Sequence, residues 1–370
     1  MKSKKDGKFY SIKKIDRYSE NFRLKYFRRE IYIMIDLNHQ NIIKLYGYFK
    51  DIEKIEKFKK IFNDSNDINI GTKDKTVYCL VLEFANNGSL EEYYKKYKLN
   101  RESYKNGEII DEEKLKNEDE IKKIINDKFI PLDEKIVIKF FKQLLEATKC
   151  LHSRSIINRD IIPDKILLDE NNNIKISDFG ISELVKDKNG LNIDKDMDLF
   201  SRSSQKGHFD FVCPEIHHKH AYHYQADIFP LGLTILCLMS FRKPIIVLKS
   251  IDGYNFRIIK KEYILKYYNE YLRSLVLRMI DDNNDIRPSA KEALNELIMI
   301  EKYIENPEGN KSIKLELEKK KDLGNIKNSH IHYIIKTPKV SQSNFQYNAF
   351  NKNNQGYQNN TCGEKNNNYL

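Results

Sequence analysis

Two aspartates flank a stretch of the sequence that reads as a β-hairpin. Short apolar strands are predicted at Ile166–Leu168 and Ile174–Ile176, with an Asn-rich turn between them. Asp160 precedes the first strand and Asp178 follows the second, so we expect both carboxylates at the mouths of one hairpin. Such a pair suits chemistry on a hydroxyl group and on a metal-bound phosphate.

The same stretch resembles the catalytic and metal-binding loops of the protein kinases. The family pattern is H-R-D-x-K-x-x-N, followed by D-F-G. Residues 158–160 (Asn-Arg-Asp) match the first triplet in part, and residues 178–180 (Asp-Phe-Gly) match the last without change. Ile162 stands where the family has lysine, and Lys165 stands where it has asparagine. The resemblance therefore implies a kinase fold with altered catalytic motifs.

In this resemblance Asp160 takes the position of the catalytic base and Asp178 that of a magnesium ligand. ATP and Mg²⁺ are the implied ligands. A protonated Lys165 cannot ligate Mg²⁺ and would repel a metal, while Ile162 cannot neutralise a γ-phosphate. Loss of one such electrostatic contact costs ~10²–10³ in rate, so we expect a pseudokinase with weak or absent phosphoryl transfer, in which binding of ATP and Mg²⁺ ranges from possible to weak or absent. A further hypothesis is that Lys165 partly substitutes for the missing metal and allows weak one-metal nucleotide binding.

The first 85 residues carry a second set of candidate site residues. Phe9–Ile15 reads as a strand that includes Lys13, and residues 20–37 read as an amphipathic helix that includes Glu30. The resemblance implies an ion pair between Lys13 and Glu30 that supports catalysis. Only twelve residues precede Lys13, whereas the family places a glycine-rich loop about twenty residues before this lysine. We therefore expect either a shortened gene product or a discarded phosphate lid.

The resemblance also implies where a nucleotide would bind. Thr76–Phe84 reads as a buried strand that leads into a hinge at Glu83–Asn87, with Leu82 beside the adenine. Nucleotide contacts are implied for Lys13, Leu82, Glu83, Ala85 and Leu167.

Three further residues are expected to be structural. Residues 207–215 and 227–232 resemble the family patterns G-T-x-x-Y-x-A-P-E and D-x-W-S-x-G, which include Glu215 and Asp227. The resemblance implies a buried ion pair between Glu215 and Arg287, in which loss of one partner costs several kcal/mol.

The resemblance covers about residues 8–300 and implies an α+β fold with two lobes. We expect a truncated, β-rich N-lobe at residues 1–85 and a mainly helical C-lobe at residues 86–305. The charged stretches 51–75 and 98–130 read as surface insertions. Asn and Gln make up 14 of the last 30 residues, so residues 306–370 are predicted to form a disordered, Asn- and Lys-rich tail.

Composition limits the class of protein. The formal charge is +11, but the basic residues are spread through mixed-charge stretches and do not form one aromatic-laced patch, which disfavours nucleic-acid binding. Five scattered cysteines without a C-x-x-C pair, and no visible secretory signal, predict an intracellular protein, cytoplasmic or nuclear. The longest apolar run, Phe229–Phe241, is too short to span a bilayer and reads as a buried helix.

Three functions stay open. The favoured hypothesis is a pseudokinase that acts as a regulator or scaffold in signalling through protein partners, such as another kinase or a Ser/Thr substrate. The second is an active Ser/Thr protein kinase with an incomplete N-terminus. The third is a basic nucleic-acid-binding protein, which predicts steeply salt-dependent retention on DNA or RNA.

Overall fold

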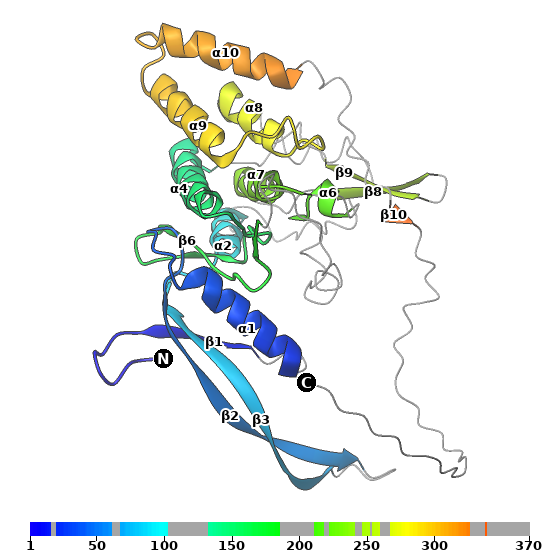
Figure 1. Cartoon of the computed structure of the whole chain (residues 1–370). Coiled ribbons are helices and arrows are strands. Elements are labelled where there is room, and N and C mark those ends of the chain that lie inside the picture. Colours follow the sequence, from blue (N-terminus) through cyan, green and yellow to red (C-terminus); the bar gives the residue numbers. More distant parts are fainter. Residues whose placement is uncertain are drawn as a thin grey trace, which may run out of the picture.

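A computed structural model describes residues 1–15, 20–60, 67–102, 132–185, 211–217, 222–240, 246–251, 254–259, 267–325 and 337–338. These residues form an α+β fold, in which a small sheet dominates the N-terminal part and helices dominate the rest (Figure 1). The predicted two-lobed α+β architecture is confirmed.

The N-terminal sheet is antiparallel, with the strand order β1-β3-β2. Strand β1 (Tyr10–Ile15) pairs with the end of β3 (Asp67–Glu83), so that Lys13 lies opposite Leu80. Helix α1 (Glu20–Met34) packs on this sheet through Phe27, whose ring centroid lies 5.0 Å from that of Tyr78 on β3. The sheet and α1 therefore hold the N-terminal site residues in a fixed relation.

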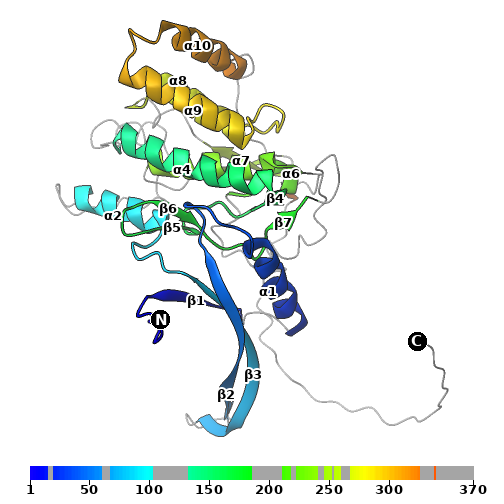
Figure 2. The same cartoon turned by 60° about the vertical axis from the view of Figure 1, so that its left-hand side comes forward.

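Strands β2 (Leu45–Lys60) and β3 continue as a long hairpin beyond this sheet. Their pairing runs from Asp51 opposite Val77 to Lys60 opposite Asp67. Figures 1 and 2 show the hairpin extending away from the helices. The described part of the predicted insertion at residues 51–75 is thus paired strand, which its charged composition did not indicate.

The C-terminal part is built around α7 (Gln225–Ser240), in which every residue from Ala226 to Ser240 is buried. Gly232 allows this close packing, because an added Cβ would lie 2.7 Å from Ile280 Cγ2. The described residues of this part also form helices α2 (Leu90–Glu102), α4 (Glu134–Ser153), α6 (Pro214–His217), α8 (Glu270–Met279) and α9 (Ala290–Glu305), besides α10 (Lys311–Asn325) described below.

Helix α4 is amphipathic, with a long apolar face. The side chain of Asp133 caps its first turn by accepting a hydrogen bond from the Lys135 amide at 2.8 Å. The apolar face is buried along the length of the helix, from Val137 to Leu151. None of the helices that the structure describes is long and apolar enough to cross a membrane.

Short strands fill the region between the sheet and the helices. Strand β5 (Ile166–Leu168) pairs with β6 (Ile174–Ile176), which is the predicted hairpin, and β4 (Ile156–Ile157) pairs with β7 (Glu183–Leu184). The amide of Ile176 donates to the Asn41 carbonyl at 2.9 Å. This bond joins the N-terminal part to the hairpin. A further sheet, unpredicted, has the order β10-β9-β8 and contains β8 (Ile246–Ile251), β9 (Tyr254–Ile259) and β10 (Thr337–Pro338).

The prediction of a disordered tail from residue 306 is wrong for Lys311–Asn325, which form helix α10. Leu317 of this helix is 1% exposed, and Tyr271 of α8 donates to Glu318 at 2.8 Å. The Lys- and Glu-rich composition obscured the single apolar face that holds the helix in place. Residues 103–131 of the second predicted insertion, and most of the chain after residue 325, lie outside the described residues.

Candidate active site

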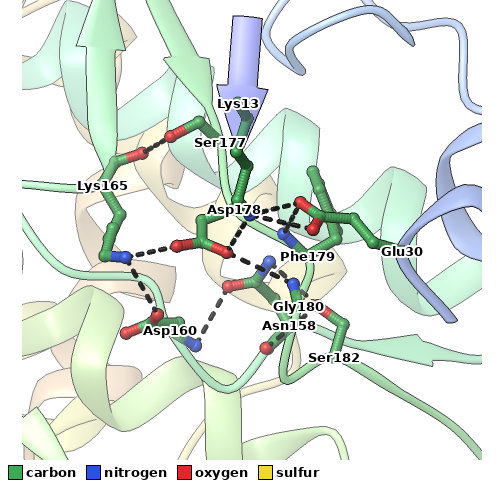
Figure 3. A network of polar contacts seen from close by, with 10 residues as sticks. All are labelled: Lys13, Glu30, Asn158, Asp160, Lys165, Ser177, Asp178, Phe179, Gly180 and Ser182. Atoms are coloured by element: carbon green, nitrogen blue, oxygen red, sulfur yellow. Dashed lines mark hydrogen bonds and ion pairs between the residues drawn. The ribbon is translucent and has the colours of Figure 1, made fainter. Parts of the chain in front are cut away.

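Lys13 forms the predicted ion pair with Glu30 and a second ion pair with Asp178 (Figure 3). The Lys13 Nζ lies 2.6 Å and 2.9 Å from the two carboxylate oxygens of Glu30 and 2.7 Å from Asp178 Oδ1. The Glu30 side chain is 1% exposed. Strand β1, helix α1 and the segment after β6 each contribute one of these residues, so the contact joins the two lobes.

Lys165 lies on the other side of Asp178. Its ammonium group donates to Asp178 Oδ2 and lies 3.9 Å from Asp160 Oδ2 (Figure 3). The register of the β5–β6 hairpin explains this position, because the pairing of Ile166 with Ile176 places Lys165 across from Ser177. Ser177 Oγ donates to the Lys165 carbonyl at 2.6 Å and fixes the end of the hairpin.

Lys13, Glu30, Asp160, Lys165 and Asp178 are called the charge cluster below. Its two aspartates are the carboxylates that the hairpin was predicted to present, and the structure brings both to one lysine. The cluster contains two ammonium groups and three carboxylates, an excess of one negative charge.

Asp178 is held in an uncommon backbone conformation. Its φ is +64°, in the left-handed region that Asp adopts more readily than most residues. The amide of Phe179 donates to Glu30 Oε1 at 3.2 Å, and the amide of Gly180 donates to Asp178 Oδ1 at 3.3 Å. These bonds offset the strain and direct the carboxylate toward the two lysines.

Asp227 positions the loop that carries Asp160. This fully buried carboxylate of α7 accepts hydrogen bonds from the amides of Asn158 at 2.8 Å and Arg159 at 2.7 Å, and lies 3.0 Å from His152 Nε2. The Asn158 side chain in turn accepts from the Asp160 amide at 3.0 Å. The predicted structural residue thus anchors the loop from the helical core.

Arg159 of the same loop forms hydrogen bonds and an ion pair through its guanidinium group. Its guanidinium donates to the Ile181 carbonyl and, at 2.7 Å, to the Tyr222 hydroxyl, and it lies 3.1 Å from Glu183 Oε2. Arg159 has a φ of +66° and is 8% exposed. The loop that presents Asp160 is therefore fixed at both its backbone and its arginine.

The contacts of the charge cluster favour the charged forms of Asp178, Lys13 and Lys165, whereas burial raises the pKa of Glu30 against the opposing effect of the Lys13 ammonium. Burial alone would raise the pKa of Asp178, but the ammonium groups of Lys13 and Lys165 hold that pKa well below its ordinary value. Burial likewise opposes the charges of Lys13 and Lys165, yet neighbouring carboxylates raise the pKa of both lysines. Lys165 is therefore an ammonium group, which has no lone pair to offer a metal.

The residues present do not fit a pair of magnesium ions. Mg²⁺ requires oxygen ligands in near-octahedral arrangement, but each oxygen of Asp178 already accepts from a lysine. A divalent ion about 4 Å from an ammonium group would be repelled by several kcal/mol even in a polar protein environment. The described residues also contain no group of three or more His, Cys, Asp or Glu side chains that could hold a metal.

Ile162, at the position that the family gives to lysine, is 3% exposed and supplies no charge. Its backbone shapes the loop, since the Lys165 amide donates to the Ile162 carbonyl at 3.0 Å. The side chain joins the apolar core.

The residues for which the resemblance implies nucleotide contacts lie at the connection between the two lobes. Leu82 is buried, Ala85 is half-buried, and Leu167 bridges Ser89 across the backbone. The Glu83 carboxylate is used internally, because it lies 2.5 Å from the Lys175 ammonium and accepts from the Lys44 amide at 3.1 Å. Its side chain thus ties the sheet to the β5–β6 hairpin.

The predicted pair of Glu215 and Arg287 is present. The guanidinium of Arg287 makes two parallel contacts with the carboxylate, at 2.7 Å and 2.9 Å. The side chains are 0% and 8% exposed for Arg287 and Glu215. This bidentate pair joins α6, which contains Glu215, to the turn before α9.

Sequence reasoning missed several polar contacts that support the site. His152 lies against Asp227, 75 positions further along the chain. Asn41 donates to the Ile174 carbonyl at 3.0 Å, and Lys175 pairs with Glu83. These partners are far apart in the chain, so spacing along the sequence carries no signal for them.

Comparison with known proteins gives one family. A family model described as "Protein kinase domain" matches residues 1–299. The chain is 33% identical over 180 residues to CBL-interacting protein kinase 2 of Oryza sativa subsp. japonica, covering 48% of this chain and 36% of that protein. It is 31% identical over 179 residues to CBL-interacting serine/threonine-protein kinase 20 of Arabidopsis thaliana, covering 47% and 36%.

A longer match reaches NUAK family SNF1-like kinase 1 of Mus musculus. The identity is 26% over 297 residues, which cover 78% of this chain and 34% of that protein. The chain therefore aligns with about a third of the length of these three curated relatives.

Proposed function

Because this chain belongs to the protein kinase domain family, we propose that it is a pseudokinase, with weak or absent phosphoryl transfer, that regulates or scaffolds signalling. Its relatives include serine/threonine protein kinases, so the partners that we propose are another protein kinase or a Ser/Thr-containing substrate protein. The chain keeps the kinase architecture, but Ile162 and Lys165 replace the lysine and the asparagine with which the family neutralises phosphate charge and binds metal.

The observation that carries the proposal is the position of the Lys165 ammonium. It donates to Asp178 and faces Asp160, so it lies between the proposed metal ligand and the proposed base. A metal at Asp178 would have to displace this ammonium group, and Asp160 would have to accept a proton beside a positive charge. Both effects oppose the roles that the family gives to these carboxylates.

The size of the defect follows from the number of lost contacts. Phosphoryl transfer depends mainly on positioning and on neutralising charge around the transferred group. Ile162 supplies no cation and Lys165 is no metal ligand. Each such loss costs ~10²–10³ in rate, although the losses are not additive. We therefore expect turnover that is negligible beside that of an intact kinase.

The rest of the site supports retention of a nucleotide-binding surface. ATP is the nucleotide that the family implies, and its own contribution to the chemistry would be a transferable γ-phosphoryl group. In this chain, Lys13 stands at the family's phosphate-contact position with its ammonium held by Glu30 and Asp178, and Lys165 is the charge-cluster residue suited to contact phosphate oxygens. Leu82 and Ala85 would contact the base. Lys13 is held in place by Glu30, as an orienting partner should do.

We also propose that the protein acts inside the cell, in the cytoplasm or the nucleus. The four cysteines in the described part of the chain (Cys79, Cys150, Cys213 and Cys237) form no disulfide, which fits a reducing compartment.

A phosphoryl-transfer assay tests the proposal. The purified chain would be incubated with γ-labelled ATP and Mg²⁺, with and without a general Ser/Thr protein substrate, beside the Asp178→Ala variant. We expect label incorporation by the wild-type chain to equal that of the variant. Robust incorporation that disappears in Asp178→Ala would establish an active kinase and refute the proposal.

A further inference from the structure

We propose that Lys165 is a built-in cation at the metal position, so that the site binds a nucleoside triphosphate without a divalent metal ion. The inference uses the same site as the proposed function and adds the form in which its ligand binds. It concerns binding alone, so the absence of phosphoryl transfer does not depend on it.

The two lysines differ in how many hydrogen-bond donors they have available for a ligand. A lysine ammonium has three N–H donors. Lys13 Nζ lies within 2.9 Å of three carboxylate oxygens, two from Glu30 and one from Asp178, which can use all three. Lys165 Nζ makes one close contact, to Asp178, while Asp160 lies at 3.9 Å, beyond hydrogen-bond distance. Lys165 therefore keeps donors for phosphate oxygens.

The position of the Lys165 ammonium group also favours a contact with phosphate oxygens. Lys165 is anchored through its backbone, because its carbonyl accepts from Ser177 Oγ at 2.6 Å and from the Ser177 amide at 3.1 Å. Its side chain is 26% exposed, so Lys165 contacts Asp178 and is also partly open to solvent. A magnesium ion in a kinase site has the same two neighbours, an aspartate of the protein and phosphate oxygens.

The net charge of the charge cluster also favours a phosphate ligand over a metal ion. Asparagine at position 165 would leave the site with one ammonium against three carboxylates, an arrangement that repels phosphates unless metal ions are added. Lys165 reduces the excess to one negative charge within the charge cluster. It also occupies the second oxygen of Asp178, which a metal would need. The same side chain thus favours phosphate and disfavours metal.

Calorimetric titration of the purified chain with ATP tests the inference, once with Mg²⁺ and once with EDTA. We expect the wild-type Kd to change by less than about threefold between the two conditions. In the Lys165→Asn variant the affinity in EDTA should fall by about tenfold or more, the size of one charge-assisted contact. In this variant Mg²⁺ should restore much of the lost affinity, because both family ligands are then present.

Two controls isolate the phosphate contact. Lys149→Asn makes the same substitution at an exposed position of α4 and should leave both titrations unchanged. Adenosine has no phosphate, so its affinity should be the same in the wild-type chain and in Lys165→Asn. Thermal unfolding of each variant checks that it is folded.

The possible results separate the two proposals. ATP binding by the wild-type chain that requires Mg²⁺ refutes the inference, and this comparison needs no substitution. Equal ATP affinity of the wild-type chain and folded Lys165→Asn in EDTA also refutes it. Complete absence of ATP binding overturns the inference but leaves the proposed lack of phosphoryl transfer intact.

Discussion

Two ionic arrangements in this molecule have different physical consequences. The pair of Glu215 and Arg287 is closed, with bidentate geometry and little exposure of either side chain. The contact between Lys165 and Asp178 is open, since both side chains are about a quarter exposed. Removal of one partner from a closed pair destabilises the fold, because it leaves a buried charge uncompensated, whereas an open pair is available to a ligand.

The closed pair gives a stability prediction. Glu215→Gln keeps the shape of the side chain but leaves the guanidinium of Arg287 buried without its counter-charge. We expect the free energy of unfolding to fall by about 3–5 kcal/mol, measured by urea denaturation. As a control, Lys142→Ala removes one partner of a pair whose side chains are about a third exposed, and should cost less than ~1 kcal/mol. Equal losses in the two variants would contradict this account.

His39 gives a prediction about pH. Burial lowers the pKa of His39 below its ordinary value of 6.5, and its Nδ1 accepts a hydrogen bond from the Asn41 amide at 3.1 Å. The folded chain therefore binds the proton less tightly than the unfolded chain. The stability from this histidine is present above pH ~6.5 and is lost as the pH falls through the lower, folded pKa.

The His39→Asn variant isolates this effect, because Asn offers an acceptor that does not titrate in this range. The melting temperature of the wild-type chain should fall more than that of the variant between about pH 7.5 and pH 5. Parallel melting curves of the two proteins across this range would show that His39 makes no such contribution.

At the scale of elements, the β5–β6 hairpin does most to assemble the site. Its strands and turn were predictable from β-branched runs and an Asn-rich turn. The direct bond between Lys165 and Asp178 was not predicted, because it depends on the pairing register and on the positive φ of Asp178. The sequence indicated the two residues and their opposite charges, and the fold determined their contact.

Helices α4 and α7 were predictable for a similar reason: each carries a long apolar pattern. Helix α10 was missed because most of its residues are charged and its apolar face is narrow. The paired strands beyond residue 51 were missed because a charged sequence resembles a solvated insertion. In both cases specific contacts determine the structure although the average composition is charged. For α10 the contact is the burial of Leu317, and for the strands it is their backbone pairing.

The packing of α10 can be tested with a matched pair of substitutions. Leu317 is 1% exposed and Leu315 is 62% exposed, on the same helix. Leu317→Ala should lower the free energy of unfolding by about 2–4 kcal/mol, because it leaves a cavity under the helix. Leu315→Ala should change it by less than ~0.5 kcal/mol. If both variants unfold at the wild-type urea concentration, α10 does not pack on the fold as described.

Across the whole molecule, the residues that maintain the kinase architecture match the family patterns, whereas two residues of the catalytic loop that would neutralise charge or bind metal do not. Asp227, Glu215 and Arg287 hold the helical part together, and Asn41 joins it to the sheet. These contacts agree with the fold that the resemblance implied. The altered positions lie at Ile162 and Lys165, in the loop that faces the expected nucleotide. This difference between retained architecture and altered charge is the basis of the proposed pseudokinase role.

The central claim is that the Lys165 ammonium stands where a kinase holds a metal ion. A crystal structure of the chain grown with a non-hydrolysable ATP analogue and Mn²⁺ tests it directly, because Mn²⁺ is located by its anomalous scattering. The account predicts the Lys165 Nζ on Asp178, with no anomalous peak beside that carboxylate. A Mn²⁺ ion coordinated by Asp178, with Lys165 turned away, would contradict it.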